Sequence, residues 1–171
     1  MVKQASKSTI QDEESYFFGE FEHSLDPQRR VAIPSNWRKE KKATFFLLPG
    51  RHNALQLIPF ATFRETLMKF KKISFADPAA SLAFARLGAI GQECECDKQG
   101  RIQIPQKLIE QVGLKNQVVL VGALTTIRIW SKENWSLLKK SDQGDQNELL
   151  DVIQKVDERP DDLMDILKGL K

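Results

Sequence analysis

Two pairs of opposite charges occur in the sequence at the same spacing. Asp26 precedes Arg30 by four residues, and Asp97 precedes Arg101 by four. A carboxylate this close to a guanidinium can form a salt bridge that holds a hairpin, worth about 1 kcal/mol or less when exposed. It can also orient the guanidinium toward a phosphate or the edge of a base. The pattern therefore predicts a structural pin or a nucleic-acid contact, and its repetition is compatible with both.

The two pairs belong to longer repeated segments. Residues 25–34 read LDPQRRVAIP and residues 96–105 read CDKQGRIQIP, with the shared Asp, Arg, Ile and Pro 71 positions apart. Alternating apolar and polar residues precede each segment, and an apolar run ending in Ile-Pro follows each shared arginine. Each copy therefore predicts a strand, a tight turn and a second strand.

The two turns differ at one position. In DKQG, residues 97–100, the glycine suits the left-handed position of a three-residue hairpin loop. The first copy has Arg29 there, and a side chain in the left-handed conformation costs about 1–2 kcal/mol. The first turn is therefore expected to be strained or shifted. A second guanidinium useful at the tip would account for Arg29, and so would a slightly different turn without functional meaning.

The similarity continues after the turns. Pro34 and Pro105 are expected to open short helices at residues 34–42 and 105–112, with Gly113 ending the second. Two strands and a helix follow in each copy. The strands are predicted at 44–50 and 54–59, then at 117–122 and 126–130, and the helices at 60–73 and 131–140. A period of about 70 residues with two copies indicates a tandem duplication.

The repeat predicts the organisation of the chain. We expect a flexible N-terminus at 1–15, a first half at 16–74, a connecting helix at 75–91, a second half at 92–140 and an acidic helical or disordered tail at 141–171. Two small halves with unpaired strand edges are expected to pair with each other. The predicted fold is mainly β with peripheral helices (α+β), in one pseudo-symmetric, barrel-like domain.

The charge is unevenly distributed along the chain. Residues 141–171 contain nine acids and four Lys or Arg, a balance of −5, which leaves residues 1–140 with 22 basic and 14 acidic groups, a balance of +8. A basic body with an acidic tail is common among nucleic-acid binders. In the tail, Leu163, Ile166, Leu167 and Leu170 recur at helical spacing, so the tail could dock on the body, bind a protein partner or stay disordered.

Other kinds of chemistry have little support in the sequence. The spacing of Cys94, Cys96, His23 and His52 matches no zinc pattern, and no nucleophile motif accompanies the histidines. We therefore expect no metal, no cofactor and no catalysis. Residues 1–18 lack the apolar centre of a secretory signal, and no stretch has the length of a membrane span. The expected location is cytoplasmic and reducing, without a membrane partner.

The repeated segments also resemble a known family. FFGEFEHSLDPQRRVAIPSNWR and CDKQGRIQIPQKLIEQVGLKNQVVLVGALTTIRIWSKENW are similar to the two halves of the MraZ family, from about Tyr16 to Leu138. The resemblance implies an AbrB-like, swapped-hairpin barrel and a bacterial, nucleoid-associated transcriptional regulator. It further implies that the arginines of both motifs belong to a surface that binds double-stranded DNA. Family members regulate the division and cell-wall gene cluster and assemble as homo-oligomeric rings. Arg29 departs from the family's usual glycine.

These observations predict a sequence-specific DNA-binding regulator. The expected DNA-contacting residues are Gln28, Arg29, Arg30, Arg38, Lys39, Lys98 and Arg101, with Asp26 and Asp97 orienting the two motif arginines. The alternative is a protein-interaction module, such as an AbrB-type antitoxin whose acidic tail binds a partner protein. Antitoxins of this kind usually have one copy of the repeat per chain, whereas this chain has two.

Overall fold

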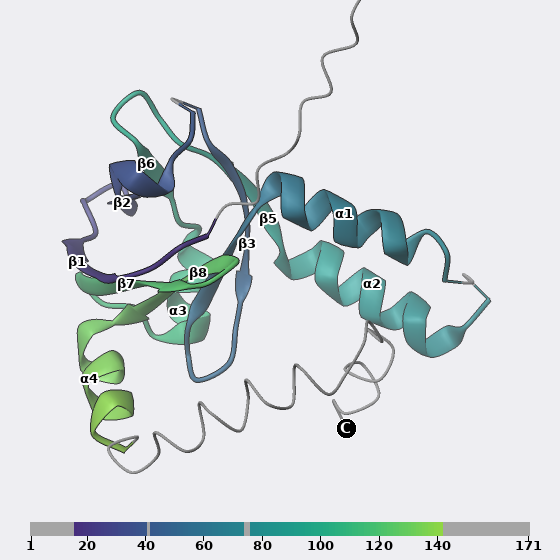
Figure 1. Ribbon diagram of the computed structural model, residues 1–171. Helices are drawn as coiled ribbons and strands as arrows, with labels where there is room; N and C mark the ends of the chain where they lie inside the picture. Colours follow the sequence, from purple (N-terminus) through teal and green to yellow (C-terminus); the bar gives the residue numbers. More distant parts are fainter. Residues whose placement is uncertain (1–15, 41, 74–75, 142–171) are drawn as a thin grey trace, which may run out of the picture. The chain divides into compact units, whose positions relative to one another are not determined.

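The computed structural model of the chain describes residues 16–40, 42–73 and 76–141. These residues form a mixed α/β structure with four α-helices and eight strands, and the strands pair antiparallel (Figure 1). The elements in chain order are β1 (Glu20–Ser24), β2 (Arg30–Ala32), the 3₁₀ turn η1 (Ser35–Trp37), β3 (Thr44–Pro49), β4 (Leu55–Pro59), α1 (Phe60–Phe70), α2 (Pro78–Ile90), β5 (Gln92–Glu95), β6 (Arg101–Gln103), α3 (Gln106–Val112), β7 (Gln117–Ala123), β8 (Thr126–Ser131) and α4 (Lys132–Ser141). The chain divides into two compact units, Met1–Trp135 and Ser136–Lys171.

Strand pairing joins the two halves of the repeat. Six strands form one sheet in the order β1-β7-β8-β4-β3-β5, and β2 pairs with β6 in a second, two-stranded sheet. Four of the pairs, β1 with β7, β2 with β6, β5 with β3 and β4 with β8, connect one half to the other. Exchanging each strand for its counterpart in the other half (β1 with β5, β3 with β7, β4 with β8) reverses the six-stranded order onto itself. The pseudo-symmetry of the sequence is therefore also a symmetry of the pairing.

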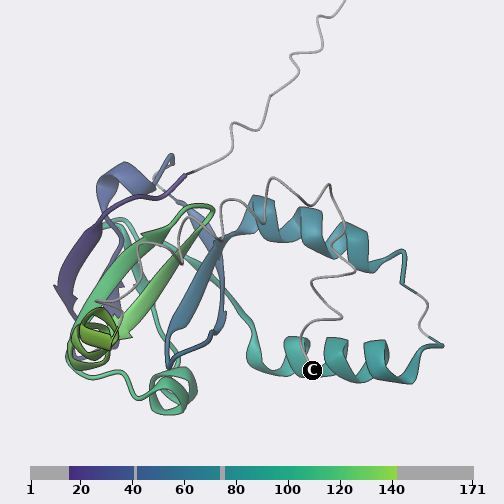
Figure 2. The same cartoon turned by 60° about the horizontal axis from the view of Figure 1, so that its bottom comes forward.

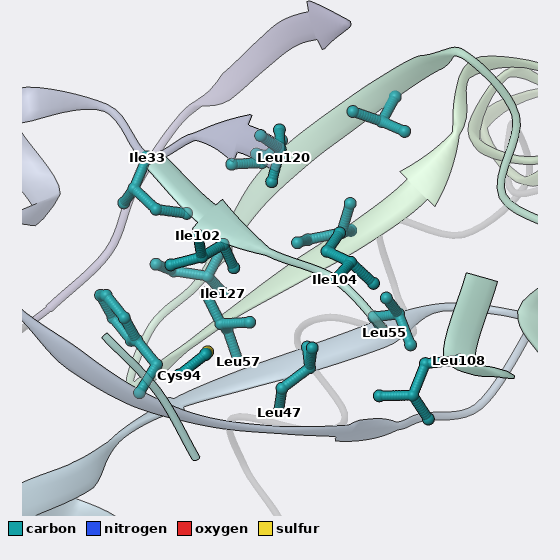
Figure 3. Close-up of a cluster of buried hydrophobic side chains, with 14 of the residues drawn as sticks. Ile33, Leu47, Leu55, Leu57, Cys94, Ile102, Ile104, Leu108, Leu120 and Ile127 are labelled. Carbon is teal, nitrogen blue, oxygen red and sulfur yellow. The ribbon is translucent and has the colours of Figure 1, made fainter. Parts of the chain in front are cut away.

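The core is built from both halves. Ile33, Leu47 and Leu57 of the first half lie in the same buried cluster as Ile102, Ile104 and Leu120 of the second (Figure 3). All six are at most 2% exposed. Alternation along the strands explains the arrangement, since β1 exposes Glu20, Glu22 and Ser24 and turns the residues between them inward. One buried cluster therefore combines residues of both halves, and it includes Val31 and Ile102 of the strands that follow the two turns.

One expected helix is missing. Among the described residues of 34–42 the only regular element is the turn η1, whereas the corresponding segment of the second half is the seven-residue helix α3. The difference has a physical cause. Leu108 and Val112 give α3 a buried face at helical spacing, but the run after Trp37 (RKEKK) has no apolar residue to bury. Arg38 is accordingly extended, at φ −113° and ψ 105°.

Other elements agree with the sequence, and Gly113 ends α3 in the left-handed conformation (φ 64°) as expected. Pro34 and Pro105 were predicted to be the first residues of their helices but occupy the N-cap positions, so η1 and α3 begin one residue later than predicted. The helix α2 lies inside the segment predicted to connect the halves and runs alongside α1 (Figures 1 and 2). The two helices contact each other through Phe70 and Phe84, whose ring centroids are 5.2 Å apart.

The expected barrel is not closed among the described strands, because the short β2 and β6 pair only with each other. The swapped-hairpin barrel therefore stays a prediction. The predictions for 1–15 and for the tail lie outside the described residues, apart from Ser141 at the end of α4.

Candidate nucleic-acid interface

The first turn, between β1 and β2, is closed by Asp26. Its Oδ1 accepts the backbone N–H groups of Gln28 at 2.9 Å and of Arg30 at 2.8 Å, and its Oδ2 accepts Nε of Arg30 at 2.7 Å. The backbone N–H of Arg29 also donates to the Asp26 carbonyl at 2.8 Å. Asp26 therefore accepts the loop N–H groups with its carboxylate and its carbonyl, and its carboxylate fixes the motif arginine.

The second turn, between β5 and β6, repeats this geometry. Asp97 Oδ1 accepts the N–H groups of Gln99 and Arg101, both at 2.9 Å, and Oδ2 accepts Nε and Nη2 of Arg101 at 3.0 and 2.9 Å. The N–H of Gly100 donates to the Asp97 carbonyl at 2.9 Å. The repeated Asp-x-x-x-Arg spacing thus encodes the same turn twice.

Pairing of β2 with β6 brings the two turns together. Arg30 lies opposite Gln103, Val31 opposite Ile102 and Ala32 opposite Arg101. Each motif arginine consequently reaches the carboxylate of the other turn as well. Nη1 of Arg30 is 3.8 Å from Oδ2 of Asp97, and Nη1 of Arg101 is 3.6 Å from Oδ2 of Asp26. The two acids and two arginines form one network, which we call the charge quartet.

The acids of the charge quartet are ionised at neutral pH. Hydrogen bonds from the backbone and side chain of Arg101 lower the pKa of Asp97 from 3.8 to about 2. Burial raises the pKa of Asp26, but the hydrogen bonds and charge of Arg30 outweigh it and leave the pKa below its ordinary value. With two anions and two cations the charge quartet has no net charge, so any net attraction for phosphate must come from cations outside it.

Arg29 occupies the left-handed position without shifting the turn. Its φ is 61°, against 76° for Gly100 at the corresponding place. The sequence predicted that the first turn is either strained or shifted, and the structure shows the strained turn. The side chain is half-buried and lines a polar hollow with Glu93 and Glu95 of β5 and Gln103 of β6. Within the described residues its buried Nε has no hydrogen-bond partner.

Arg38 of the first half lies over the second turn. A Cβ added at Gly100 would come 2.3 Å from Cζ of Arg38, so the guanidinium occupies the space that a side chain at position 100 would need. Nε of Arg38 donates to the Ile33 carbonyl at 3.0 Å, and the Ile33 N–H donates to the Gly100 carbonyl at 2.9 Å. Arg38 is thus tied to the turn that it covers.

The other expected contact residues are distributed unevenly. Gln28 and Lys98 are exposed at the two turns. Lys39 is exposed and lines a surface hollow with Phe60 and Glu65 of α1. Sequence reasoning missed Gln99, which is exposed and equivalent to Gln28 by the 71-residue offset. It also missed Gln103, whose Nε2 donates to the Gln28 carbonyl at 3.2 Å.

The cysteines and histidines are not grouped for metal binding. In the part of the chain that the structure describes, no three His, Cys, Asp or Glu residues are placed as candidate ligands. Burial raises the pKa of Cys94 to about 12 and that of Cys96 to about 11, so both are neutral thiols in the hydrophobic core. No helix among the described residues is long and apolar enough to cross a bilayer.

The fold and the paired turns define a duplicated protein with antiparallel strands that presents two like turns at one surface. A family model described as "MraZ protein, putative antitoxin-like" matches the chain twice, at residues 16–85 and 89–150. The chain belongs to the MraZ family.

Similar proteins have a regulatory name. The protein of Caldicellulosiruptor saccharolyticus named "Transcriptional regulator MraZ" is 43% identical over 120 residues, which are 68% of this chain and 82% of the relative. Proteins of the same name from Clostridium acetobutylicum and Acetivibrio thermocellus are 38% and 37% identical, over 70% and 77% of this chain and 84% and 89% of theirs. These relatives are named as regulators and not as enzymes.

Proposed function

We propose that this chain is a sequence-specific, DNA-binding transcriptional regulator that contacts duplex DNA through its two paired turns. The observation that carries the proposal is the pairing of β2 with β6, which sets two like turns side by side. The names of the relatives support the regulatory role.

The charge distribution supports a phosphate-binding surface at the turns. The charge quartet is neutral and its guanidiniums are committed to carboxylates at 2.7–3.8 Å. Arg29, Arg38 and Lys98 are the additional cations at the turns, and each phosphate they contact would release counterions. In this proposal Arg30 and Arg101 contact DNA only with the N–H groups that the acids leave available, and they also hold the turns in shape.

Base recognition is assigned to the turn tips. Gln28 and Gln99 are exposed and equivalent in the repeat. A glutamine amide can form paired hydrogen bonds with adenine in the major groove. Because both tips have a glutamine at the same place, they would favour a DNA site with two related half-sites.

The proposal is tested with a charge reversal at one tip and a matched control. Lys98→Glu should weaken binding to a duplex by about tenfold and lower the slope of log affinity against log salt by one to two units. Lys72→Glu makes the same change in net charge at an exposed residue after α1, which lies on the other side of the strands from β2 and β6 (Figures 1 and 2). Equal effects of the two variants would mean that the turns are not the contact surface.

The proposal includes self-association into a ring. The helix α2 is apolar except at Ser81 and Arg86, yet none of its residues is buried, and Leu82 is 54% exposed. Such a helix supplies a surface that another copy could cover. Leu82→Glu should reduce the mass measured by light scattering, and Ser81→Glu should leave it unchanged. A wild-type protein that is monomeric at micromolar concentration would contradict the ring.

The finer expectations that came from the resemblance belong to the same proposal. These are the swapped-hairpin barrel, the nucleoid location and a target promoter in the division and cell-wall gene cluster. A selection of bound duplexes from a random pool would give the operator, and a match upstream of that cluster is the expected result.

One alternative has a specific observation in its favour, since the description of the matching family model includes the word antitoxin-like. In that case the acidic segment 141–171, nearly all of it outside the described residues, would bind a partner protein. A wild-type chain that binds no duplex even at low salt would favour this alternative.

A further inference from the structure

The two turns differ in where their guanidiniums originate. At the left-handed position the first turn has Arg29 and the second has Gly100. Four residues after Pro34 the first half has Arg38, and at the equivalent place the second half has Ile109. The first half therefore has two arginines where the second has none, although the strands and turns of the halves correspond.

The position of Arg38 provides the second turn with a guanidinium. The guanidinium of Arg38 lies at the second turn, with Cζ, Nη1 and Nη2 at 2.3, 2.5 and 2.7 Å from the position that a Cβ of Gly100 would take. The hydrogen bonds of Ile33, to Arg38 on one side and to Gly100 on the other, fix it there at 3.0 and 2.9 Å. Burial raises the pKa of Cys96, next to Asp97, to about 11, and the nearby charge of Arg38 opposes this rise.

We propose that Arg38 is the phosphate-contacting guanidinium of the second turn, supplied by the first half, and that Gly100 is required because its bare backbone makes room for it. The inference rests on the proposed function and deepens it by stating which turn Arg38 serves. Each turn then presents one guanidinium beside the charge quartet: Arg29 from within the first turn, and Arg38 from across the interface at the second.

A double-mutant cycle tests the proposal on the full chain. The probe is a mixed-sequence duplex of roughly 30 base pairs, because phosphate contacts do not depend on the operator. Arg38→Ala should lower the salt slope by about one unit. Gly100→Ala should have a similar effect without changing any charge, because the new Cβ displaces the guanidinium. The double variant should be no worse than either single variant, since both remove the same contact.

A matched control separates displacement from backbone strain. Gly113 is also left-handed, at φ 64°, but nothing lies within 4 Å of a Cβ added there. Gly113→Ala should therefore lower the unfolding temperature as Gly100→Ala does, and leave the salt slope unchanged. A merely structural role of Arg38 would change the unfolding temperature and not the slope.

The outcomes distinguish this inference from the proposed function. If the wild-type chain binds no duplex, the proposed function fails. If the wild type binds and Arg38→Ala keeps its affinity and salt slope, Arg38 is not a contact and only the inference fails. Additive losses in Gly100→Ala and Arg38→Ala would overturn the claim that Gly100 makes room for the guanidinium.

Discussion

The two turns have the same backbone and different side chains. In both, an aspartate binds two backbone N–H groups at 2.8–2.9 Å and holds an arginine four residues later. At the left-handed position, however, the first turn has an arginine at φ 61° and the second a glycine at φ 76°. The comparison teaches that the duplication preserved the structural pin while the surrounding cations changed.

The difference has an energetic consequence. Arg29 adopts a conformation that costs an L-residue about 1–2 kcal/mol, whereas Gly100 adopts it without that cost. The second turn is thus relaxed and has no side chain of its own at this position. Substitutions at equivalent places in the two halves can separate what the turns share from what distinguishes them.

The largest effect on stability is expected in the buried part of the β2–β6 pair, which both turns share. Val31 and Ile102 are paired between β2 and β6, and both are 0% exposed. Ile102→Ala should lower the free energy of unfolding by about 2–5 kcal/mol. Val31→Ala should cost less, because it removes one carbon atom fewer from the same core. Urea denaturation measures both, and a greater loss from Val31→Ala would show that the first turn has separate support.

The next effect is the dependence of stability on acidic pH, through the two aspartates of the charge quartet. Because the folded pKa of Asp97 is lowered from 3.8 to about 2, its carboxylate stabilises the fold above pH 3.8, and this contribution is lost as pH falls toward 2. The pKa of Asp26 is lowered in the same direction. In Asp97→Asn and Asp26→Asn the unfolding temperature should fall less steeply over this range than in the wild type. Parallel profiles for all three proteins would contradict the role of the charge quartet.

A smaller effect is expected from relaxing the first turn. Arg29→Gly removes the left-handed strain but gives the unfolded chain more freedom, so the free energy of unfolding should rise by up to about 1 kcal/mol. The salt slope for duplex binding should fall by about one unit. A less stable variant would show instead that the Arg29 side chain supports the fold, for example through Glu93 and Glu95 in the hollow that it lines.

The smallest effect concerns a contact that only one turn has. Gln103 donates to the Gln28 carbonyl at 3.2 Å, but the equivalent residue of the first half is Ala32, which cannot return the bond. Gln103→Ala should cost no more than about 0.5 kcal/mol of stability, since the bond is exposed. It should speed amide exchange in the first turn and not in the second, and equal changes would contradict the asymmetry.

Local patterns predicted the turns better than their surroundings. The Asp-x-x-x-Arg spacing and the alternation of side chains were sufficient for both turns. The expected hairpins were wrong, because β1 pairs with β7, β5 with β3, and β2 with β6, so the strands that flank a turn do not pair with each other. The 71-residue offset, applied to Gln28, would also have pointed to Gln99. The helix expected at 34–42 was wrong because the comparison of Pro34 with Pro105 ignored the missing apolar face. The place of Arg38 could not be predicted, because it depends on strand pairing between halves, which no local pattern encodes.

The central claim is that both turns contact duplex DNA together. Hydrogen–deuterium exchange, measured by mass spectrometry with and without a duplex, tests it directly and does not depend on the size of the assembly. The account predicts slower exchange in segments 25–33 and 96–104, with the same dependence on DNA concentration, and little change in α1 and α2. Protection confined to one turn, or centred on the helices, would contradict the account.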